Sequence, residues 1–204
     1  MKKLTMAFAL TAGMALAQVA LAQATVGQAA PPFSASDASG KPVSLADYKG
    51  KYVVLEWVNK DCPFSQKHYD SGNISASQKH AAAKGAVWLA VSTSAAGPKD
   101  KAAATSLAGW MKEKNATPSA IVLDSGPIGR AYGAKTTPHM YLIDPAGKIV
   151  YAGAIDSKAS SNPADVAGAT NYVKLALDEA LAGKALSKPV TQPYGCSVKY
   201  GSAS

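Results

Sequence analysis

The chain has 204 residues and a formal net charge of +8, from 21 lysines and arginines against 13 aspartates and glutamates. Arg130 is its one arginine, and the lysines are spread singly rather than in a stripe. This distribution argues against a nucleic-acid-binding protein and favours a solvated basic surface. Cysteine occurs twice, as Cys62 and Cys196.

The first 22 residues have the pattern of a secretory signal peptide. Two lysines precede an apolar run from Leu4 to Ala22, which ends in an A-x-A cleavage motif. We therefore expect an exported protein, periplasmic or secreted, with no membrane anchor once residues 1–22 are removed. No other stretch is long and apolar enough to cross a bilayer. Residues 23–204 suffice for a single domain with a proper core, in which residues 185–204 form a C-terminal tail.

The part after the signal peptide is predicted to begin with a hairpin, and a buried strand should follow. Asp37-Ala38-Ser39-Gly40 is a turn signal between short apolar pieces, which predicts an N-terminal hairpin within residues 33–51. Residues 52–58 are β-branched, aromatic or apolar apart from Glu56. That composition is typical of a strand buried on both faces of a sheet.

The middle of the chain is predicted to alternate helices and strands. A helical run at residues 75–84 ends at Gly85, and a buried strand at 86–91 follows. Strand, helix and strand in this order predict a right-handed crossover between two parallel strands. The next expected elements are a helix at 100–115, a strand at 120–123 and a brief helix at 127–132.

The last part predicts a second hairpin, a long helix and the tail. A turn at Pro145-Ala146-Gly147 separates expected strands at 140–144 and 148–152. Asn162-Pro163 predicts the start of one long helix that ends at Gly183. The buried side of this helix is expected to hold Ala167, Tyr172, Leu175, Ala176 and Leu181. The tail should be irregular except where another part of the chain ties it down.

Cys62 lies where the buried strand turns into a helix that should extend to about Ser71. Pro63 suits the first helical turn, where its missing N–H is no loss, so Cys62 is predicted at the N-cap. The unpaired amides and the positive end of the helix dipole there favour a thiolate over a thiol. Cys62 is therefore the candidate nucleophile. The alternative is a structural disulfide between Cys62 and Cys196.

Four segments of the chain carry a resemblance to a known family. The stretch from Val53 through Cys62-Pro63-Phe64-Ser65 looks like an active-site strand and turn, and residues 132–144 look like the loop and strand that bear a cis-proline, here Pro138. Residues 26–33 with 45–51, and residues 195–199 after a long helix, look like the start and end of the same kind of domain. Together they resemble the thioredoxin superfamily in its AhpC/TSA, or redoxin, branch, which includes peroxiredoxin-like proteins. This resemblance implies a thioredoxin-like three-layer α/β/α fold with a central mixed sheet.

The resemblance implies roles for residues around Cys62. Glu56, six residues earlier, matches a buried acid that carries protons to the resolving thiol, and burial would raise its pKa toward that of a general base. The alternative is a strand-end glutamate turned to solvent or paired with a lysine. Thr137-Pro138 would lie against Cys62 and, together with Pro63 and Phe64, would bind the substrate.

Ser65 stands where the second cysteine of Cys-x-x-Cys would be, and a serine cannot resolve a mixed disulfide. The second thiol must therefore come from Cys196 or from a partner. Cys196 follows Pro193-Tyr194-Gly195 in a flexible tail end that could reach back over the sheet edge, which makes it the candidate resolving thiol. The alternative is a spare or intermolecular thiol.

Two features of this chain depart from the pattern of peroxide-reducing members of the family. The signature P-x-x-x-[TS]-x-x-C would need proline at position 55 and threonine or serine at position 59, and this chain has Leu55 and Asn59. Peroxiredoxins also need an arginine beside the sulfur, whereas Arg130 lies in the brief helix before the Pro138 loop.

The sequence thus predicts an exported thiol oxidoreductase of antioxidant type that needs no cofactor and no metal. Its partners would be a protein thiol reductant and a disulfide or hydroperoxide substrate. Two other classes stay open. One is a non-enzymatic thioredoxin-like binding module with a static Cys62–Cys196 disulfide. The other is a metal-handling protein that uses Cys62 with His139, His68 or Met140, although such scattered residues lack metal-ligand spacing.

Overall fold

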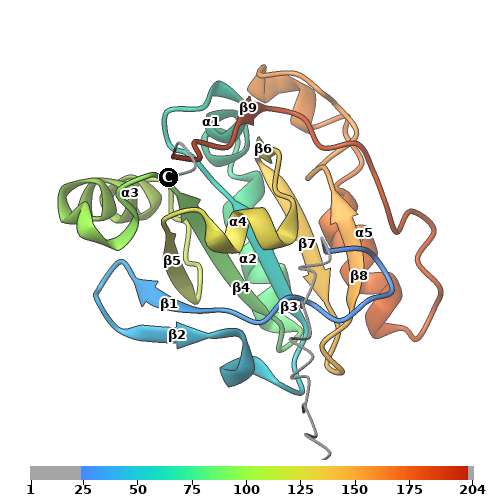
Figure 1. Cartoon of the computed structure of the whole chain (residues 1–204). Coiled ribbons are helices and arrows are strands. Elements are labelled where there is room, and N and C mark those ends of the chain that lie inside the picture. The colour runs from blue at the N-terminus through green and yellow to red at the C-terminus, as the bar shows by residue number, and fades with distance from the viewer. Residues whose placement is uncertain (1–23, 202–204) are drawn as a thin grey trace, which may run out of the picture.

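The computed structural model describes residues 24–201, and a seven-stranded mixed sheet lies at its centre (Figure 1). The strand order is β2-β1-β5-β4-β3-β7-β8. The neighbours β3, β4 and β5 are parallel, and every other pair is antiparallel. The bounds are β1 Ser34–Asp37, β2 Pro42–Ser44, β3 Val53–Trp57, β4 Val87–Thr93, β5 Ala120–Asp124, β7 His139–Ile143 and β8 Ile149–Gly153.

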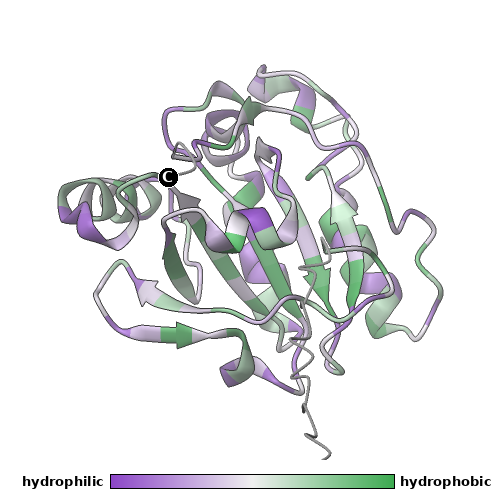
Figure 2. Ribbon diagram, in the orientation of Figure 1, coloured by the Kyte–Doolittle hydropathy of each residue, from purple (hydrophilic) through white to green (hydrophobic). Residues whose placement is uncertain are grey.

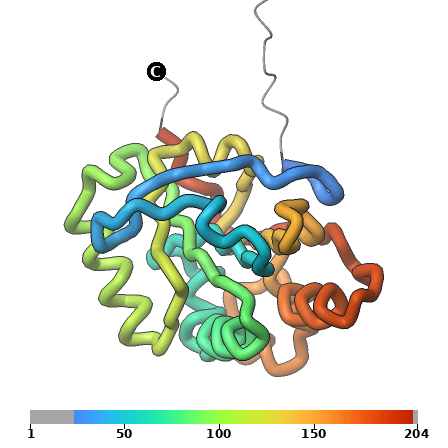
Figure 3. Tube along the Cα trace, turned by 90° about the horizontal axis from the view of Figure 1, so that it is seen from below, coloured from blue at the N-terminus to red at the C-terminus, as the bar shows by residue number. Residues whose placement is uncertain are grey.

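Helices cover both faces of this sheet, as the predicted three-layer arrangement requires. The α-helices of residues 24–201 are α1 Pro63–Asp70, α2 Asn73–Ala83, α3 Lys101–Glu113, α4 Pro127–Tyr132 and α5 Tyr172–Leu181. Figure 3 shows α2 and α5 side by side on one face, and the N-terminal segment crosses the opposite face, where α4 also packs. None of these helices is long and apolar enough to span a membrane. The predicted signal peptide lies outside the described residues.

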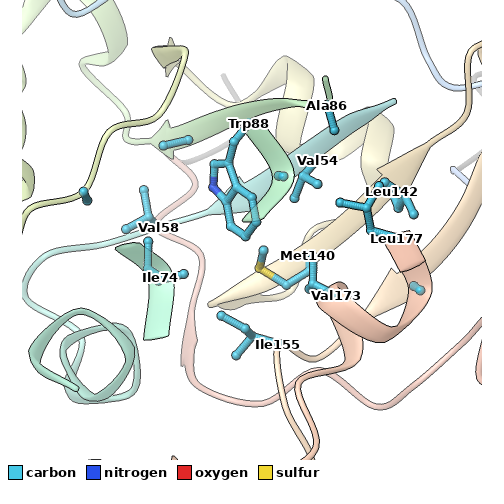
Figure 4. Packing of buried hydrophobic residues seen from close by; sticks show 14 of the residues in the cluster. Val54, Val58, Ile74, Ala86, Trp88, Met140, Leu142, Ile155, Val173 and Leu177 are labelled. Atoms are coloured by element: carbon cyan, nitrogen blue, oxygen red, sulfur yellow. The ribbon is translucent and has the colours of Figure 1, made fainter. Parts of the chain in front are cut away.

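The central strands are buried on both sides because their apolar side chains alternate between two cores. All five residues of β3 are buried, and Figure 2 shows hydrophobic colour along the central strands. One core holds Trp57 of β3 against Tyr132 and Tyr141. The other holds Trp88 and Met140 with residues of α2 and α5 (Figure 4). The prediction of a doubly buried strand at residues 52–58 is confirmed.

The predicted long last helix is wrong, because the chain forms two separate helices there. A short 3₁₀ helix, Pro163–Val166, is capped by Asn162, and α5 begins only at Tyr172. Asn171 provides this second start: its side-chain oxygen accepts the N–H of Lys174, and its amide nitrogen donates to Asn73 and Ser77 of α2. A second N-cap held by contacts with α2 therefore interrupts the helix that Asn162-Pro163 would have begun.

The buried side predicted for that helix is corrected with it. Ala176 is buried as expected, but the other buried positions are Val173 and Leu177. Leu181 is 40% exposed. Of the remaining predicted positions, Tyr172 and Leu175 are half-buried and Ala167 is exposed. The packing of α5 against β7 and α2 decides which stripe is buried, and that stripe is displaced around the helix axis from the predicted one.

The C-terminal tail is ordered because several parts of the chain hold it. It runs back along β8, where Thr191 N–H donates to Ala152. It then reaches the top of the molecule in Figure 1, where β9 (Cys196–Ser197) pairs with β6 (Thr136–Thr137) in a separate two-stranded sheet. Farther on, the Tyr200 hydroxyl donates to the carbonyl of Ala134. The tail is thus tied down at both sides of Cys196.

Candidate thiol active site

Cys62 occupies the N-cap of α1, as predicted. Its backbone is extended, with φ −90° and ψ 119°, and Pro63 begins the helix behind it. The carbonyl of Cys62 accepts the first helical hydrogen bond, from Gln66 N–H at 2.9 Å. The sulfur therefore lies at the helix end whose free amides favour negative charge. The residue as a whole is only 1% exposed.

The loop that bears Pro138 lies against this sulfur. The Thr137–Pro138 peptide bond is cis, and Cys62 Sγ lies 3.0 Å from the carbonyl oxygen of Thr137, to which the thiol donates. β3 and β7 bring the two segments together, since Trp57 and His139 are register partners in that antiparallel pair. Residues 75 positions apart in the chain thus form one wall of the site.

Cys196 reaches Cys62 through the pairing of β9 with β6, in which Cys196 is the register partner of Thr137. Both cysteines are free thiols, and the Cys196 thiol hydrogen-bonds the Cys62 sulfur. Gly195 makes this approach possible. Its φ is +133°, and a Cβ at this position would lie 2.2 Å from the Thr137 carbonyl oxygen, so only glycine fits without a shift.

The two thiols differ in acidity. Burial alone would raise the pKa of Cys62. Hydrogen bonds from the side chains of Cys196 and Thr137 and from the backbone N–H groups of Ser65 and Cys196 outweigh burial, so the pKa lies below that of an ordinary cysteine. Burial and then the adjoining Cys62 sulfur raise the pKa of Cys196 to about 11. Cys62 is therefore the more acidic thiol of the pair and Cys196 the less acidic one.

Glu56 is buried in β3, with 1% of its surface exposed. The alternative of a solvent-facing glutamate is wrong. Its carboxylate accepts the indole N–H of Trp88 at 2.8 Å, and burial, offset in part by Trp88 and Tyr69, raises its pKa to about 7. A carboxyl group with this pKa exchanges protons near neutral pH. Since its hydrogen bond goes to Trp88, proton transfer to the thiols would need a carrier such as water.

The predicted substrate-binding residues of α1 face the tail or solvent. Pro63 is exposed, and Phe64 is half-buried. The Phe64 ring packs edge-on against Tyr194 of the tail, with 5.9 Å between ring centroids. The tail therefore covers part of the surface that the sequence assigned to a substrate.

The histidines considered as metal ligands serve structural contacts. His68 Nε2 lies 3.0 Å from the Tyr194 hydroxyl, and His139 Nδ1 accepts the N–H of Lys135. Burial lowers the pKa of both His68 and His139 to about 4, so both are neutral at physiological pH. Within residues 24–201, no group of three or more histidine, cysteine, aspartate or glutamate side chains is arranged to hold a metal ion.

Arg130 also serves the tail and not the sulfur. Its guanidinium lies 4.7 Å from the centre of the Tyr200 ring and donates to the carbonyl of Gly201. Sequence reasoning missed a second group near the site, the buried Lys67 and Asp156 with Tyr194. A lysine in an otherwise amphipathic helix gives no signal that it is buried, and its partner lies in a loop far along the chain.

Comparison with solved structures shows the fold. An uncharacterized conserved protein from Geobacillus kaustophilus is 23% identical with a TM-score of 0.73, over 88% of this chain and 94% of that one. A hypothetical protein from Sinorhizobium meliloti 1021 is 21% identical with a TM-score of 0.70, over 89% and 98%. A putative thiol:disulfide interchange protein DsbE from Chlorobium tepidum is 26% identical with a TM-score of 0.52, over 64% and 85%.

These similarities confirm the predicted thioredoxin-like α/β fold. No curated protein matches the sequence. The AhpC/TSA family model matches residues 26–152, which include the strand before Cys62, the Cys62 turn and the Pro138 loop. The chain belongs to the AhpC/TSA family, within the redoxin branch of the thioredoxin superfamily.

Proposed function

We propose that this protein is an exported thiol–disulfide oxidoreductase that cycles through Cys62, with Cys196 as its resolving thiol. The observation that carries the proposal is the contact between two free thiols at the start of α1, with pKa values shifted in opposite directions. Thiol exchange needs this pairing, because the attacking sulfur must be a thiolate and its partner must be within reach. The similarity to a protein titled as a putative thiol:disulfide interchange protein supports the same chemistry.

The reaction proceeds in two exchanges. The Cys62 thiolate attacks one sulfur of a substrate disulfide, a mixed disulfide forms, and the other substrate sulfur leaves as a thiolate. Cys196 then loses its proton and attacks the Cys62 sulfur, so the second substrate thiolate leaves and a Cys62–Cys196 disulfide remains. Two electrons pass to the substrate in all. A dithiol of a protein reductant returns both cysteines to the thiol form.

Three other residues assist in this proposal. Glu56, with a pKa of about 7, takes the proton that Cys196 must lose, through a water molecule. Thr137 and Pro138 present the backbone edge beside Cys62 on which the substrate would lie once the β9 strand, which pairs with Thr137, moves aside. Disulfides are favoured over hydroperoxides as substrates, because Arg130, the one arginine of the chain, is engaged with Tyr200 and Gly201. The signal-peptide pattern of residues 1–22 supports export.

The central prediction is that mild oxidation joins Cys62 and Cys196 within one chain. Intact mass after alkylation should show two modified cysteines in reduced protein and none in oxidised protein. Cys62→Ser should abolish reduction of a model disulfide, and Cys196→Ser should halt it at a mixed disulfide. A redox titration should give a potential less negative than about −300 mV, as for a catalytic pair. A more negative potential would instead mark the non-enzymatic module with a structural disulfide.

A second prediction concerns the acidity of Cys62. In Cys196→Ser, whose hydroxyl can still donate to the sulfur, alkylation by iodoacetamide should show a midpoint below the ~8.5 of a free cysteine. In Cys196→Ala the donor is absent, so the midpoint should be higher than in the serine variant. A midpoint at or above that of a free thiol in the serine variant would remove the argument that Cys62 is the nucleophile.

A further inference from the structure

A buried polar cluster lies beneath the tail next to the thiols. Lys67 of α1 and Asp156, in the loop after β8, have fully buried side chains, and Lys67 Nζ lies 3.3 Å from Asp156 Oδ2. Lys67 also donates to the carbonyl of Lys158 at 2.7 Å. A buried ion pair is costly to desolvate, and apolar side chains of similar size often stabilise a fold at least as well. The pair therefore calls for a role beyond stability.

Tyr194 is the tail residue that this cluster holds. Its hydroxyl donates to Asp156 Oδ1, lies 3.0 Å from His68 Nε2, and accepts from Lys67 Nζ at 3.4 Å. The Lys67 ammonium also lies 5.5 Å from the centre of the Tyr194 ring. A phenol hydroxyl with an ionised acceptor and a cationic donor is held more firmly than one with neutral partners.

The cluster is close to the thiols along both segments of the chain that meet there. Lys67 and His68 lie in α1, the helix that Cys62 caps. Tyr194 lies two residues before Cys196, with only Gly195 between them. Gly195 packs on the Thr137 carbonyl and has no side chain to hold it there. Tyr194 is thus the last side-chain anchor of the tail before the resolving thiol.

We propose that Tyr194 is a positioning residue for thiol exchange. The buried Lys67–Asp156 pair and His68 hold its hydroxyl and thereby keep the Cys196 strand on β6, over Cys62, while both cysteines are reduced. This inference rests on the proposed function, since it concerns the step in which Cys196 attacks the Cys62 sulfur.

The effect of this anchor is preorganisation. A tail that is already in place in the dithiol state loses little conformational entropy when the disulfide forms, so the effective concentration of one thiol at the other is high. The same seated strand keeps Cys62 at 1% exposure and so restricts the access of outside reagents to its sulfur. Loss of the Tyr194 contacts should lower the effective concentration of the two thiols and raise the exposure of Cys62, while both cysteines and Glu56 are unchanged.

The test is Tyr194→Phe in the full chain, which removes the hydroxyl and keeps the ring on Phe64 and Lys67. Tyr52→Phe is the matched control, because it also loses a hydroxyl hydrogen bond, to the carbonyl of Ala180, away from the tail strand and the thiols. In a glutathione redox buffer, Tyr194→Phe should lower the effective concentration of one thiol at the other about tenfold. For a two-electron couple this makes the reduction potential of the Cys62–Cys196 disulfide about 30 mV less negative. Tyr52→Phe should match the wild type.

A second measurement tests the role of Tyr194 in protein that cannot form the Cys62–Cys196 disulfide. In the Cys196→Ser background, Tyr194→Phe should raise the rate of iodoacetamide alkylation of Cys62 several-fold, and Tyr52→Phe should not. If Tyr194→Phe leaves both the effective concentration and the alkylation rate at wild-type values, the anchor is wrong while the proposed function stands. If wild-type protein forms no Cys62–Cys196 disulfide, the proposed function fails, and the alkylation rates alone confirm or refute the anchor.

Discussion

Gly195→Ala is expected to unseat the tail strand and to raise the alkylation rate of Cys62 about a hundredfold in the Cys196→Ser background. An alanine Cβ would lie 2.2 Å from the Thr137 carbonyl oxygen, and φ +133° is a conformation that L-residues rarely adopt. A strained backbone costs about 1–3 kcal/mol, and the collision with a carbonyl adds to that cost. Separation of β9 from β6 relieves both, and it exposes a sulfur that is otherwise buried.

The control for this variant is Gly40→Ala, in the turn between β1 and β2. Gly40 also has a positive φ, +85°, but nothing lies within 4 Å of the added Cβ. It therefore carries the backbone strain without the collision and lies away from the thiols. Iodoacetamide alkylation at constant pH compares the two variants directly. Equal rates for Gly195→Ala and the parent would mean that the tail strand does not cover Cys62.

Glu56→Gln should stabilise the folded protein at alkaline pH and should slow the resolving step. Burial raises the pKa of Glu56 from 4.5 to about 7, so the folded state holds a proton that the unfolded state releases between these two values. The stability of the wild type due to this group is fully present below about pH 4.5 and is lost as the pH rises through about 7. The pKa shift corresponds to about 3 kcal/mol.

Chemical denaturation at about pH 4 and about pH 8.5 checks this expectation. At each pH the free energy of unfolding of wild type is subtracted from that of Glu56→Gln. This difference should be about 3 kcal/mol larger at about pH 8.5 than at about pH 4. Glu113→Gln, at an exposed position of α3, should show no such pH dependence. An equal pH dependence of Glu56→Gln and wild type would mean that Glu56 does not titrate near neutral pH.

The rates of the two exchange steps test the predicted role of Glu56 in catalysis. A general base typically contributes about a hundredfold or more, so the release of substrate thiolate from the mixed disulfide should slow by about that factor in Glu56→Gln. The first attack by Cys62 should be little affected, because its sulfur is already disposed to be a thiolate. Unchanged rates in both steps would end the proton-carrier role and leave Glu56 as a buried partner of Trp88.

Local patterns predicted the parts of the fold that depend on neighbouring residues. The apolar run at β3 and the proline after Cys62 act within a few residues, and the structure has a doubly buried strand and an N-cap cysteine there. The same kind of signal at Asn162-Pro163 led to the wrong prediction of one long helix. That pair does begin a helical turn, but Asn171 offers a second cap, and its contacts with Asn73 and Ser77 of α2 decide where α5 starts.

By itself the sequence determined which residues could do the chemistry: a cysteine at a helix start, an acid in a buried strand, and a second cysteine in a glycine-containing tail. These are properties of residue type and local backbone, and they need no distant partner. Only the tertiary structure decided what surrounds them, including the indole of Trp88 on Glu56, the contact of Cys196 with Cys62, and the Lys67–Asp156 cluster under Tyr194. The physical reason is that hydrogen bonds, burial and pKa shifts depend on distances in space, and these contacts join segments that lie far apart along the chain.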